Sequence, residues 1–216
     1  MEMFCQDRDL LCLEPVVFIG HCLGGQVVAA GAGASIAAGR LASAQPMAVA
    51  SIQPGMVLTA WNTAASEGSA YEILAAESPT HLSLSVLRAD RTSAAVAPLD
   101  WANVSFQVRT YGAQIAAISR QLSEKLRPVA QSMGVLAADF VESGQLRMLT
   151  AYGVLAALFM ARASAGLDSD INRVKAMHYQ EFFRSHQAGL RLAADVDGDG
   201  VAERTAALGN VSLRRV

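Results

Sequence analysis

The segment VSFQVRTY, residues 104–111, alternates apolar and polar side chains at almost every step. Val104, Phe106 and Val108 fall on one side of an extended chain, and the residues between them are polar. Because the side-chain period of a β-strand is two, this segment predicts a strand with one buried face. A helical period begins directly after Tyr111, so the segment also marks the end of the β part of the chain.

The segments before it show the same period. HLSLSVLR, residues 81–88, places Leu82, Leu84 and Val86 on one face, and we expect that face to be buried. Further strands are predicted over 56–61, after a Pro-Gly turn, and over 70–78; a tight turn at Gly39 separates Ile36 from Leu41. Short strands without long helices between them indicate a small antiparallel barrel or sandwich over residues 34–111.

After Tyr111 the apolar residues recur with the period of an α-helix to about residue 192. We expect a first helix with one apolar stripe that ends at Pro128, because proline lacks the backbone donor that a helix interior needs. The stripe consists of Ile115, Ile118, Leu122 and Leu126.

Two more helices are predicted in this region. The first contains the 14-residue apolar run Met148–Ala161, which is shorter than the roughly 20 residues that cross a bilayer and predicts a buried helix. Its small residues should allow close helix packing; they are Ala151, Gly153, Ala156, Ala157 and Ala161. The second helix begins near Asp168 and Asp170, and one side of it carries Ile171, Val174, Met177 and Phe182.

The predicted fold class is therefore α+β, with a small antiparallel β barrel or sandwich before a helical bundle and an extended C-terminal tail. The predicted parts are an N-terminal helical segment (1–33), the β module (34–111), the bundle (112–192) and an acidic turn with a strand-like tail (193–216). Within the first part, Pro15 is expected to restart the helix.

The composition narrows the classes of function. Hydrophobic residues make up 52% of the 216 residues and charged residues only 17%, so we expect apolar side chains in subunit contacts as well as in the core. A net charge of −2 gives no indication of a general nucleic-acid binder.

The string GHCLGG, residues 20–25, looks like a nucleophile elbow with Cys22 in the place of the serine. Such an elbow lies between a strand and a helix of a parallel sheet, after an earlier strand that supplies an oxyanion loop. Too few residues precede Pro15 for that strand. Of the candidate bases His81, His178 and His186, the last two lie in a helical pattern with no strand before them. We expect Cys22 to be a small apolar residue and the histidines to be packed or solvated, with a Cys22 hydrolase as the alternative.

The segment DVDGDGVAE, residues 195–203, has the alternating acidic residues of a calcium-binding loop. Its candidate ligands are Asp195, Asp197, Asp199 and Glu203. Ala206 stands at the twelfth position, where a bidentate glutamate is usual, so the alternative is a polar turn without metal. We expect no cofactor other than this structural Ca²⁺.

The last residues resemble a strand without an evident partner. Val211 and Leu213 alternate with polar residues, and Arg214 and Arg215 add positive charge. Such a segment can pair with the sheet of another protein, where backbone hydrogen bonds give affinity. The alternative is that it returns to the edge of the chain's own β module.

Taken together, the order of these parts resembles the head–tail connector (adaptor) proteins of tailed phages and prophages. The resemblance spans nearly the full chain, although each matching segment is of low specificity. The segment GHCLGGQVVAAGAGAS (20–35) does not match well. It is carried by DRDLLCLEP (7–15), QPGMVLTAW (53–61), LSLSVLRAD (82–90), VSFQVRTYGAQIAAISRQLSEKL (104–126), GQLRMLTAYGVLAALFMARAS (144–164), DINRVKAMHYQEFFRSHQ (170–187) and DVDGDGVAERTAALGNVSLRRV (195–216).

The resemblance implies a structural protein of the virion neck rather than an enzyme. The helical bundle would assemble as a ring of about twelve copies beneath the portal protein, because cyclic heterologous interfaces close at a fixed number. The tail, with Val211, Leu213, Arg214 and Arg215, would dock on the portal, and a tail or stopper protein would bind the other side. DNA would pass through the ring without specific binding, and no membrane is expected. Another neck component, such as a stopper or tail-completion protein, is the alternative.

Overall fold

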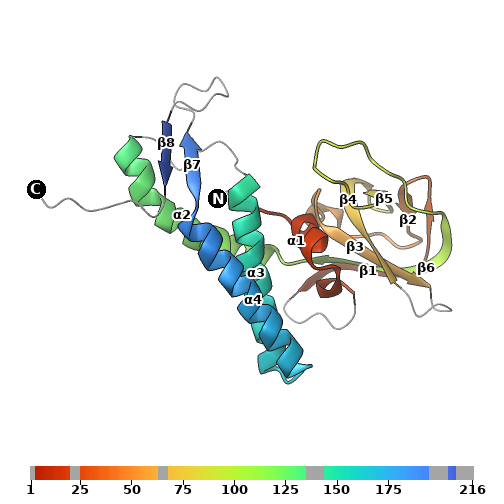
Figure 1. Ribbon diagram of the computed structural model, residues 1–216. Helices are drawn as coiled ribbons and strands as arrows, with labels where there is room; N and C mark the ends of the chain where they lie inside the picture. Colours follow the sequence, from red (N-terminus) through yellow and green to blue (C-terminus); the bar gives the residue numbers. More distant parts are fainter. Residues whose placement is uncertain (1–2, 20–24, 63–67, 135–143, 195–203, 208–216) are drawn as a thin grey trace, which may run out of the picture. The chain divides into compact units, whose positions relative to one another are not determined.

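The structure, a computed structural model, describes residues 3–19, 25–62, 68–134, 144–194 and 204–207 (Figure 1). The elements, in chain order, are α1 (Asp7–Leu13), η1 (Pro15–Val17), β1 (Gln26–Ala37), β2 (Arg40–Ala42), η2 (Val49–Ser51), β3 (Val57–Asn62), β4 (Gly68–Ser78), β5 (His81–Ser85), β6 (Trp101–Thr110), α2 (Gly112–Met133), α3 (Gly144–Ser164), α4 (Ser169–Ala188), β7 (Arg191–Ala194) and β8 (Arg204–Ala207).

The chain forms two compact units. The barrel unit is Gln6–Gly112, and the helical unit combines Met1–Cys5 with Ala113–Val216. The predicted fold class is confirmed: a six-stranded antiparallel barrel precedes three helices. As predicted, a new helical segment begins at Pro15: α1 ends at Leu13, and Pro15 is the first residue of the 3-10 helix η1.

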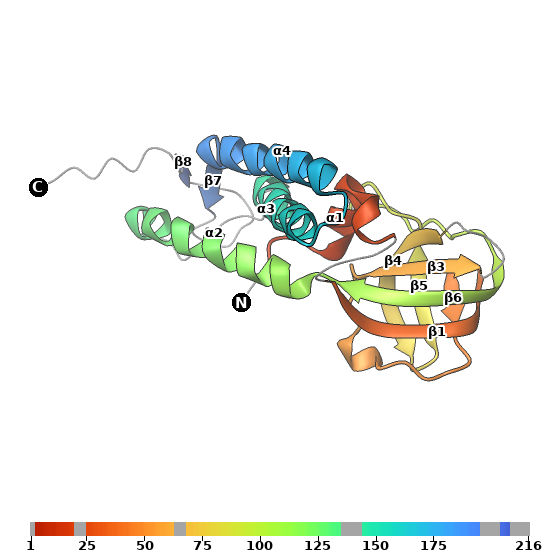
Figure 2. The same cartoon turned by 90° about the horizontal axis from the view of Figure 1, so that it is seen from below.

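Six strands close the barrel in the order β1-β2-β5-β4-β3-β6, and every neighbouring pair is antiparallel. Figure 2 shows these strands curving around one interior. Its core contains the predicted inward residues Val104, Phe106 and Val108. Val86 was predicted wrongly: β5 ends at Ser85, and the Val86 side chain is 43% exposed.

Strand β1 differs from the prediction of a helical segment through residue 33. Its glycines and alanines have little intrinsic strand propensity, but pairing with β6 on one side and β2 on the other holds the segment extended. Gly31 lies so close to Phe106 that a Cβ atom there would be 2.6 Å from the ring. Gly33 has a φ of 68° where the pairing register shifts, so this strand needs glycine at both points.

Replacing Gly31 with alanine is therefore expected to destabilise the barrel by about 1–3 kcal/mol, because Phe106 is buried and cannot move away without disturbing the core. Urea unfolding followed by tryptophan fluorescence measures the change. Gly68→Ala in β4 is the matched control, since its nearest neighbour would lie at an ordinary 3.4 Å. An equal loss of stability in both variants would contradict the argument.

Helix α2 continues five residues past Pro128, contrary to the prediction that it ends there. The residues after the proline explain this result. Val129 and Ala130 are buried with Leu122 and Leu126 in the core of the helical unit. Burial of one more apolar turn thus offsets the loss of the backbone hydrogen bond at the proline.

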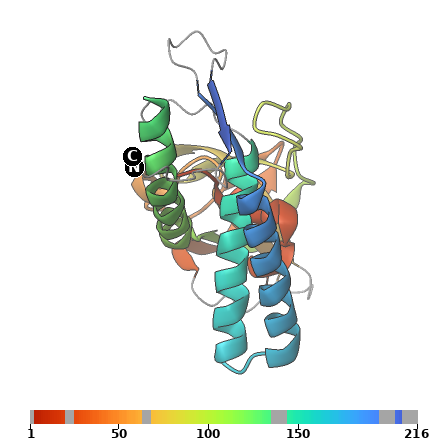
Figure 3. The same cartoon turned by 60° about the vertical axis from the view of Figure 1, so that its left-hand side comes forward.

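Helices α3 and α4 lie side by side and are joined by a short connection (Figure 3). Gly153 of α3 permits this packing as predicted: a Cβ atom would lie 2.9 Å from Phe183 of α4 and 3.0 Å from Ile118 of α2. Helix α4 ends at Ala188 instead of near residue 192. The following residues, Arg191–Ala194, pair with Arg204–Ala207 as the two-stranded sheet β7-β8, which was not predicted.

Candidate functional site

Several predicted site residues lie outside the described part of the chain. These are the tail residues Val211, Leu213, Arg214 and Arg215 and the acidic residues Asp195, Asp197, Asp199 and Glu203. Ala194 is paired with Arg204, so the acidic segment connects two hydrogen-bonded strands. Among the described residues, no group of three or more His, Cys, Asp or Glu side chains could hold a metal ion.

Cys22 also lies outside the described residues, but its neighbours on both sides are described. The 3-10 helix Pro15–Val17 precedes it where an elbow needs a strand, and strand β1 follows it where an elbow needs a helix. The barrel is antiparallel throughout, whereas an elbow lies at the end of a parallel strand. The described elements on the two sides of Cys22 therefore differ from the strand and the helix that flank such an elbow.

The histidines of α4 pack against aromatic rings. The ring of His178 lies 4.2 Å from that of Phe182, and the ring of His186 lies 5.1 Å from that of Tyr152. His81 is tied to its own turn, where its Nδ1 atom is 3.1 Å from the Ser78 hydroxyl. His178 and His186 are exposed as well as in contact with these rings, in agreement with the prediction of packed or solvated histidines.

A cluster of buried charges fixes α1 to the barrel. Glu72 of β4 is paired with two arginines: its Oε1 atom lies 3.1 Å from Nε of Arg8 and 2.8 Å from Nη2 of Arg88, which also donates through Nε to Oε2. A second pair joins Asp9 to Arg91 at 3.3 Å. Each of these groups has a partner, so the cluster serves to hold the helix and the 86–100 loop in place.

Asp7, at the start of the same helix, is buried. Its carboxylate accepts hydrogen bonds from the Thr110 side chain and from the Tyr111 backbone N–H, the latter at 2.7 Å. Burial nevertheless raises the pKa of Asp7 to about 6, and the nearby charge of Asp9 adds to the effect. The Tyr111 hydroxyl donates to the Val17 carbonyl at 2.6 Å, so these groups also join the N-terminal segment to β6.

The surface of α4 carries a row of large apolar side chains that the described structure leaves uncovered. Ile171, Val174 and Met177 are 65%, 67% and 61% exposed; we call them the α4 stripe. Helix α4 instead packs through Asn172, Ala176 and Tyr179, which are buried.

The reason is that α4 has two apolar faces. Ala176, Tyr179 and Phe183 recur at helical spacing, as do the residues of the stripe, so the pattern alone did not decide which face is buried. The buried face is the one whose Tyr179 ring stacks on Phe159 of α3, with centroids 5.8 Å apart, and whose Phe183 ring lies against Gly153 of α3. Sequence reasoning could have used the small residues of α3 as the signal.

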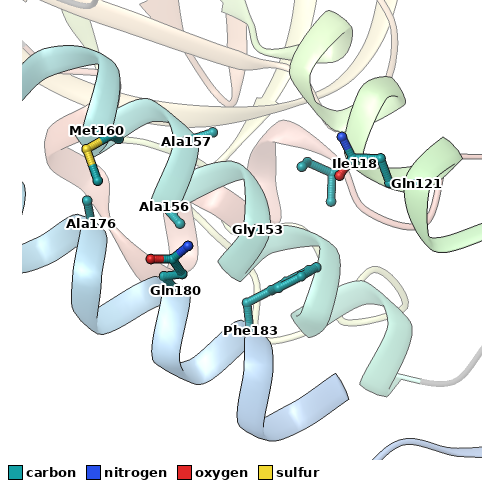
Figure 4. Close-up of a pocket in the computed structure, with 9 residues that line it drawn as sticks. All are labelled: Ile118, Gln121, Gly153, Ala156, Ala157, Met160, Ala176, Gln180 and Phe183. Atoms are coloured by element: carbon teal, nitrogen blue, oxygen red, sulfur yellow. The ribbon is translucent and has the colours of Figure 1, made fainter. Parts of the chain in front are cut away.

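An apolar groove of about 290 Å³ lies in the helical unit, with α3 as its floor (Figure 4). Gly153, Ala156, Ala157 and Met160 of α3 line it, and α2 and α4 form its walls. The remaining lining residues are Ile118, Gln121, Ala176, Gln180 and Phe183. None of the lining side chains is charged, so the groove suits an apolar occupant.

By length and composition, helix α3 could cross a membrane, but half of its most apolar window is buried inside the structure. Core helices of soluble proteins share these properties. Leu149, Val154 and Leu155 are completely buried, in agreement with the prediction of a buried helix.

No protein-family model, no curated protein and no solved structure matches this chain.

Proposed function

We propose that this protein is a structural head-to-tail adaptor of a tailed phage, which assembles as a ring beneath the portal and links the capsid to the tail. The observation that carries the proposal is the α4 stripe. Three neighbouring aliphatic side chains, each more than 60% exposed, mark an interaction surface more strongly than scattered apolar residues do.

The remaining features support this role. Subunit rings need repeated contacts between two different surfaces of each copy, and the α4 stripe and the apolar groove are two such surfaces. The partners that follow from this role are further copies of the chain, the portal protein, and a tail or stopper protein. DNA would pass through the ring without specific binding, which the net charge of −2 favours.

Ring formation is the direct test. We expect negative-stain images of the protein, mixed with the portal of the phage or prophage that carries its gene, to show closed rings of about twelve copies. Val174→Asp should abolish the rings, because it places a carboxylate in the centre of an apolar contact; Leu99→Asp is the control, with an 84% exposed side chain in the barrel unit. Single copies bound to portal, by mass photometry, would contradict the proposal.

The portal-docking role of the tail is tested by truncation. Removing residues 208–216 leaves β7 and β8 complete, so we expect a folded protein. If the tail supplies the docking strand through Val211 and Leu213, the truncated protein should lose at least tenfold in affinity for portal. Unchanged affinity in a titration calorimetry experiment would place the docking surface elsewhere.

A further inference from the structure

The chain passes between its two units twice, once between residues 5 and 6 and once between residues 112 and 113. Asp7 is the second residue of the barrel unit, and Tyr111 is the last but one. A hydrogen bond joins them, because a carboxylate oxygen of Asp7 accepts from the Tyr111 backbone N–H at 2.7 Å. This bond therefore ties together the two points at which the chain enters and leaves the barrel unit.

The same carboxylate organises the start of α2. It accepts a hydrogen bond from the Thr110 hydroxyl group, and the oxygen of that hydroxyl group accepts from the backbone N–H of Gly112 at 2.9 Å. Gly112 is the first residue of α2, and the N–H groups of a first turn have no partner within the helix. Asp7 thus holds residues 110–112, where β6 ends and α2 begins, directly through Tyr111 and indirectly through Thr110.

Asp7 lies among groups that do not compensate a negative charge. Its side chain is 3% exposed, and its two hydrogen-bond donors are neutral. The neighbouring Arg8 is paired with Glu72, and the carboxylate of Asp9, itself paired with Arg91, repels a charge on Asp7. A buried carboxyl group in this setting is more stable with its proton than without it.

The other elements around Asp7 add no compensating cation in the described part of the chain. The segments η1 and β3, which pack against α1, carry no titratable side chain. The remaining titratable neighbours are two thiols, a phenol and a guanidinium group that donates to Gln107; they belong to Cys5, Cys12, Tyr111 and Arg109. Burial therefore dominates the ionisation of Asp7, in agreement with its pKa of about 6.

Helix α1 has further anchors that do not involve Asp7. The Arg8 backbone N–H donates to the Gly55 carbonyl at 2.9 Å, and the Arg8 guanidinium group pairs with the buried Glu72. The Tyr111 ring is buried as well, and its hydroxyl group donates to the Val17 carbonyl. Loss of the bonds to Asp7 would thus leave α1 and the Tyr111 ring in place and free only the backbone of residues 110–112.

We infer that Asp7 is a proton-dependent latch on the junction of β6 and α2: its protonated carboxyl group holds residues 110–112 closed, and its ionised form turns to water and releases them. The protonated group still accepts from the Tyr111 N–H through its carbonyl oxygen, and its O–H donates to the Thr110 oxygen. The two states differ by one proton, which comes from the solvent. Because residues 112 and 113 form one of the two connections between the units, the latch sets the stiffness of that connection.

Amide hydrogen exchange of the full chain tests the latch. Exchange is measured by NMR and corrected for its intrinsic dependence on pH. Because the closed junction binds the Asp7 proton more tightly than the open one, opening at Tyr111 and Gly112 should increase up to about tenfold between about pH 5 and pH 7.5. The Ile73 amide, which donates to the Met56 carbonyl in the barrel, is the reference for global unfolding and should exchange more slowly at each pH.

Two variants assign the effect to Asp7. Asp7→Asn should abolish the pH dependence at the junction, because an amide accepts the same N–H bond but does not ionise. Asp100→Asn is the matched control: Asp100 also accepts a backbone N–H, from Ala38 at 3.0 Å, but at an exposed site. That variant should keep the wild-type dependence at Tyr111.

Three results would overturn the inference. A junction that exchanges at the rate of Ile73 at every pH opens only when the whole unit unfolds. Exchange that does not vary with pH would mean that Asp7 does not control the junction. A dependence that persists in Asp7→Asn would assign it to another group. If Asp7→Asn does not fold, the comparison of Tyr111 with Ile73 in the wild type still separates a local latch from global unfolding.

Discussion

Replacing Glu72 with alanine is expected to lower the free energy of unfolding of the barrel unit by about 3–5 kcal/mol. The Glu72 and Arg8 side chains are 2% and 3% exposed, and Arg88 is 15% exposed. Removing the carboxylate leaves two guanidinium groups without their counter-charge in a place that water barely reaches. Denaturant unfolding of the wild type and the variant measures the loss.

Glu77, five residues further along β4, provides the control. It is paired with Arg40, but the two side chains are 33% and 57% exposed. Because exposed ion pairs contribute about 0–1 kcal/mol, Glu77→Ala should change the stability by no more than that. A similar cost for both glutamates would show that burial does not set the contribution of Glu72.

The second large effect concerns pH. The pKa of Asp7 is raised from the ordinary 3.8 to about 6 in the folded protein, so the folded state binds this proton more tightly than the unfolded state. The stability that the protonated Asp7 carboxyl group contributes is fully present below about pH 4 and is lost as the pH rises through 6. This difference in the pKa of Asp7 between the unfolded and folded states corresponds to about 3 kcal/mol of stability.

Asp7→Asn removes this dependence, since the amide cannot ionise and its oxygen still accepts from the Tyr111 N–H. We expect the stability of the variant relative to the wild type to rise by up to about 3 kcal/mol between pH 4 and pH 7. Urea midpoints at several pH values give this difference. A difference that does not vary with pH would mean that Asp7 titrates normally.

Asp90 provides a control of opposite sign. Hydrogen bonds from the side chains and backbone of Thr92 and Ser93 lower the pKa of its carboxyl group. Its contribution to stability is present above the ordinary pKa and is lost as the pH falls. Asp90→Asn should therefore destabilise the protein relative to the wild type more at pH 7 than at pH 3.

Local periodicity was enough to predict most of the barrel. Val104, Phe106 and Val108 alternate with polar residues and are buried as expected, because only one side of a barrel strand faces the interior. Strand β1 was missed, since its glycines carry no periodic signal and are explained only by contacts far along the chain, such as Gly31 with Phe106.

The candidate surfaces were harder to predict from sequence. Val174 and Ala176 lie on opposite sides of α4, and either side is apolar enough to be the buried one. The choice depends on α3, whose Gly153 and small neighbours accept one face and leave the other uncovered. The same limit applies to Pro128, where the burial of Val129 outweighs a local helix-breaking signal.

The first five residues belong to the helical unit, although the whole barrel follows them in the sequence. The Phe4 N–H donates to the Ser119 hydroxyl at 3.2 Å, and Phe4 packs against the helical core. During synthesis, which proceeds from the N-terminus, residues 6–112 can fold as a unit before that partner helix exists. The barrel is thus an insertion within the helical unit, and that unit can be completed only after the whole barrel has been synthesised.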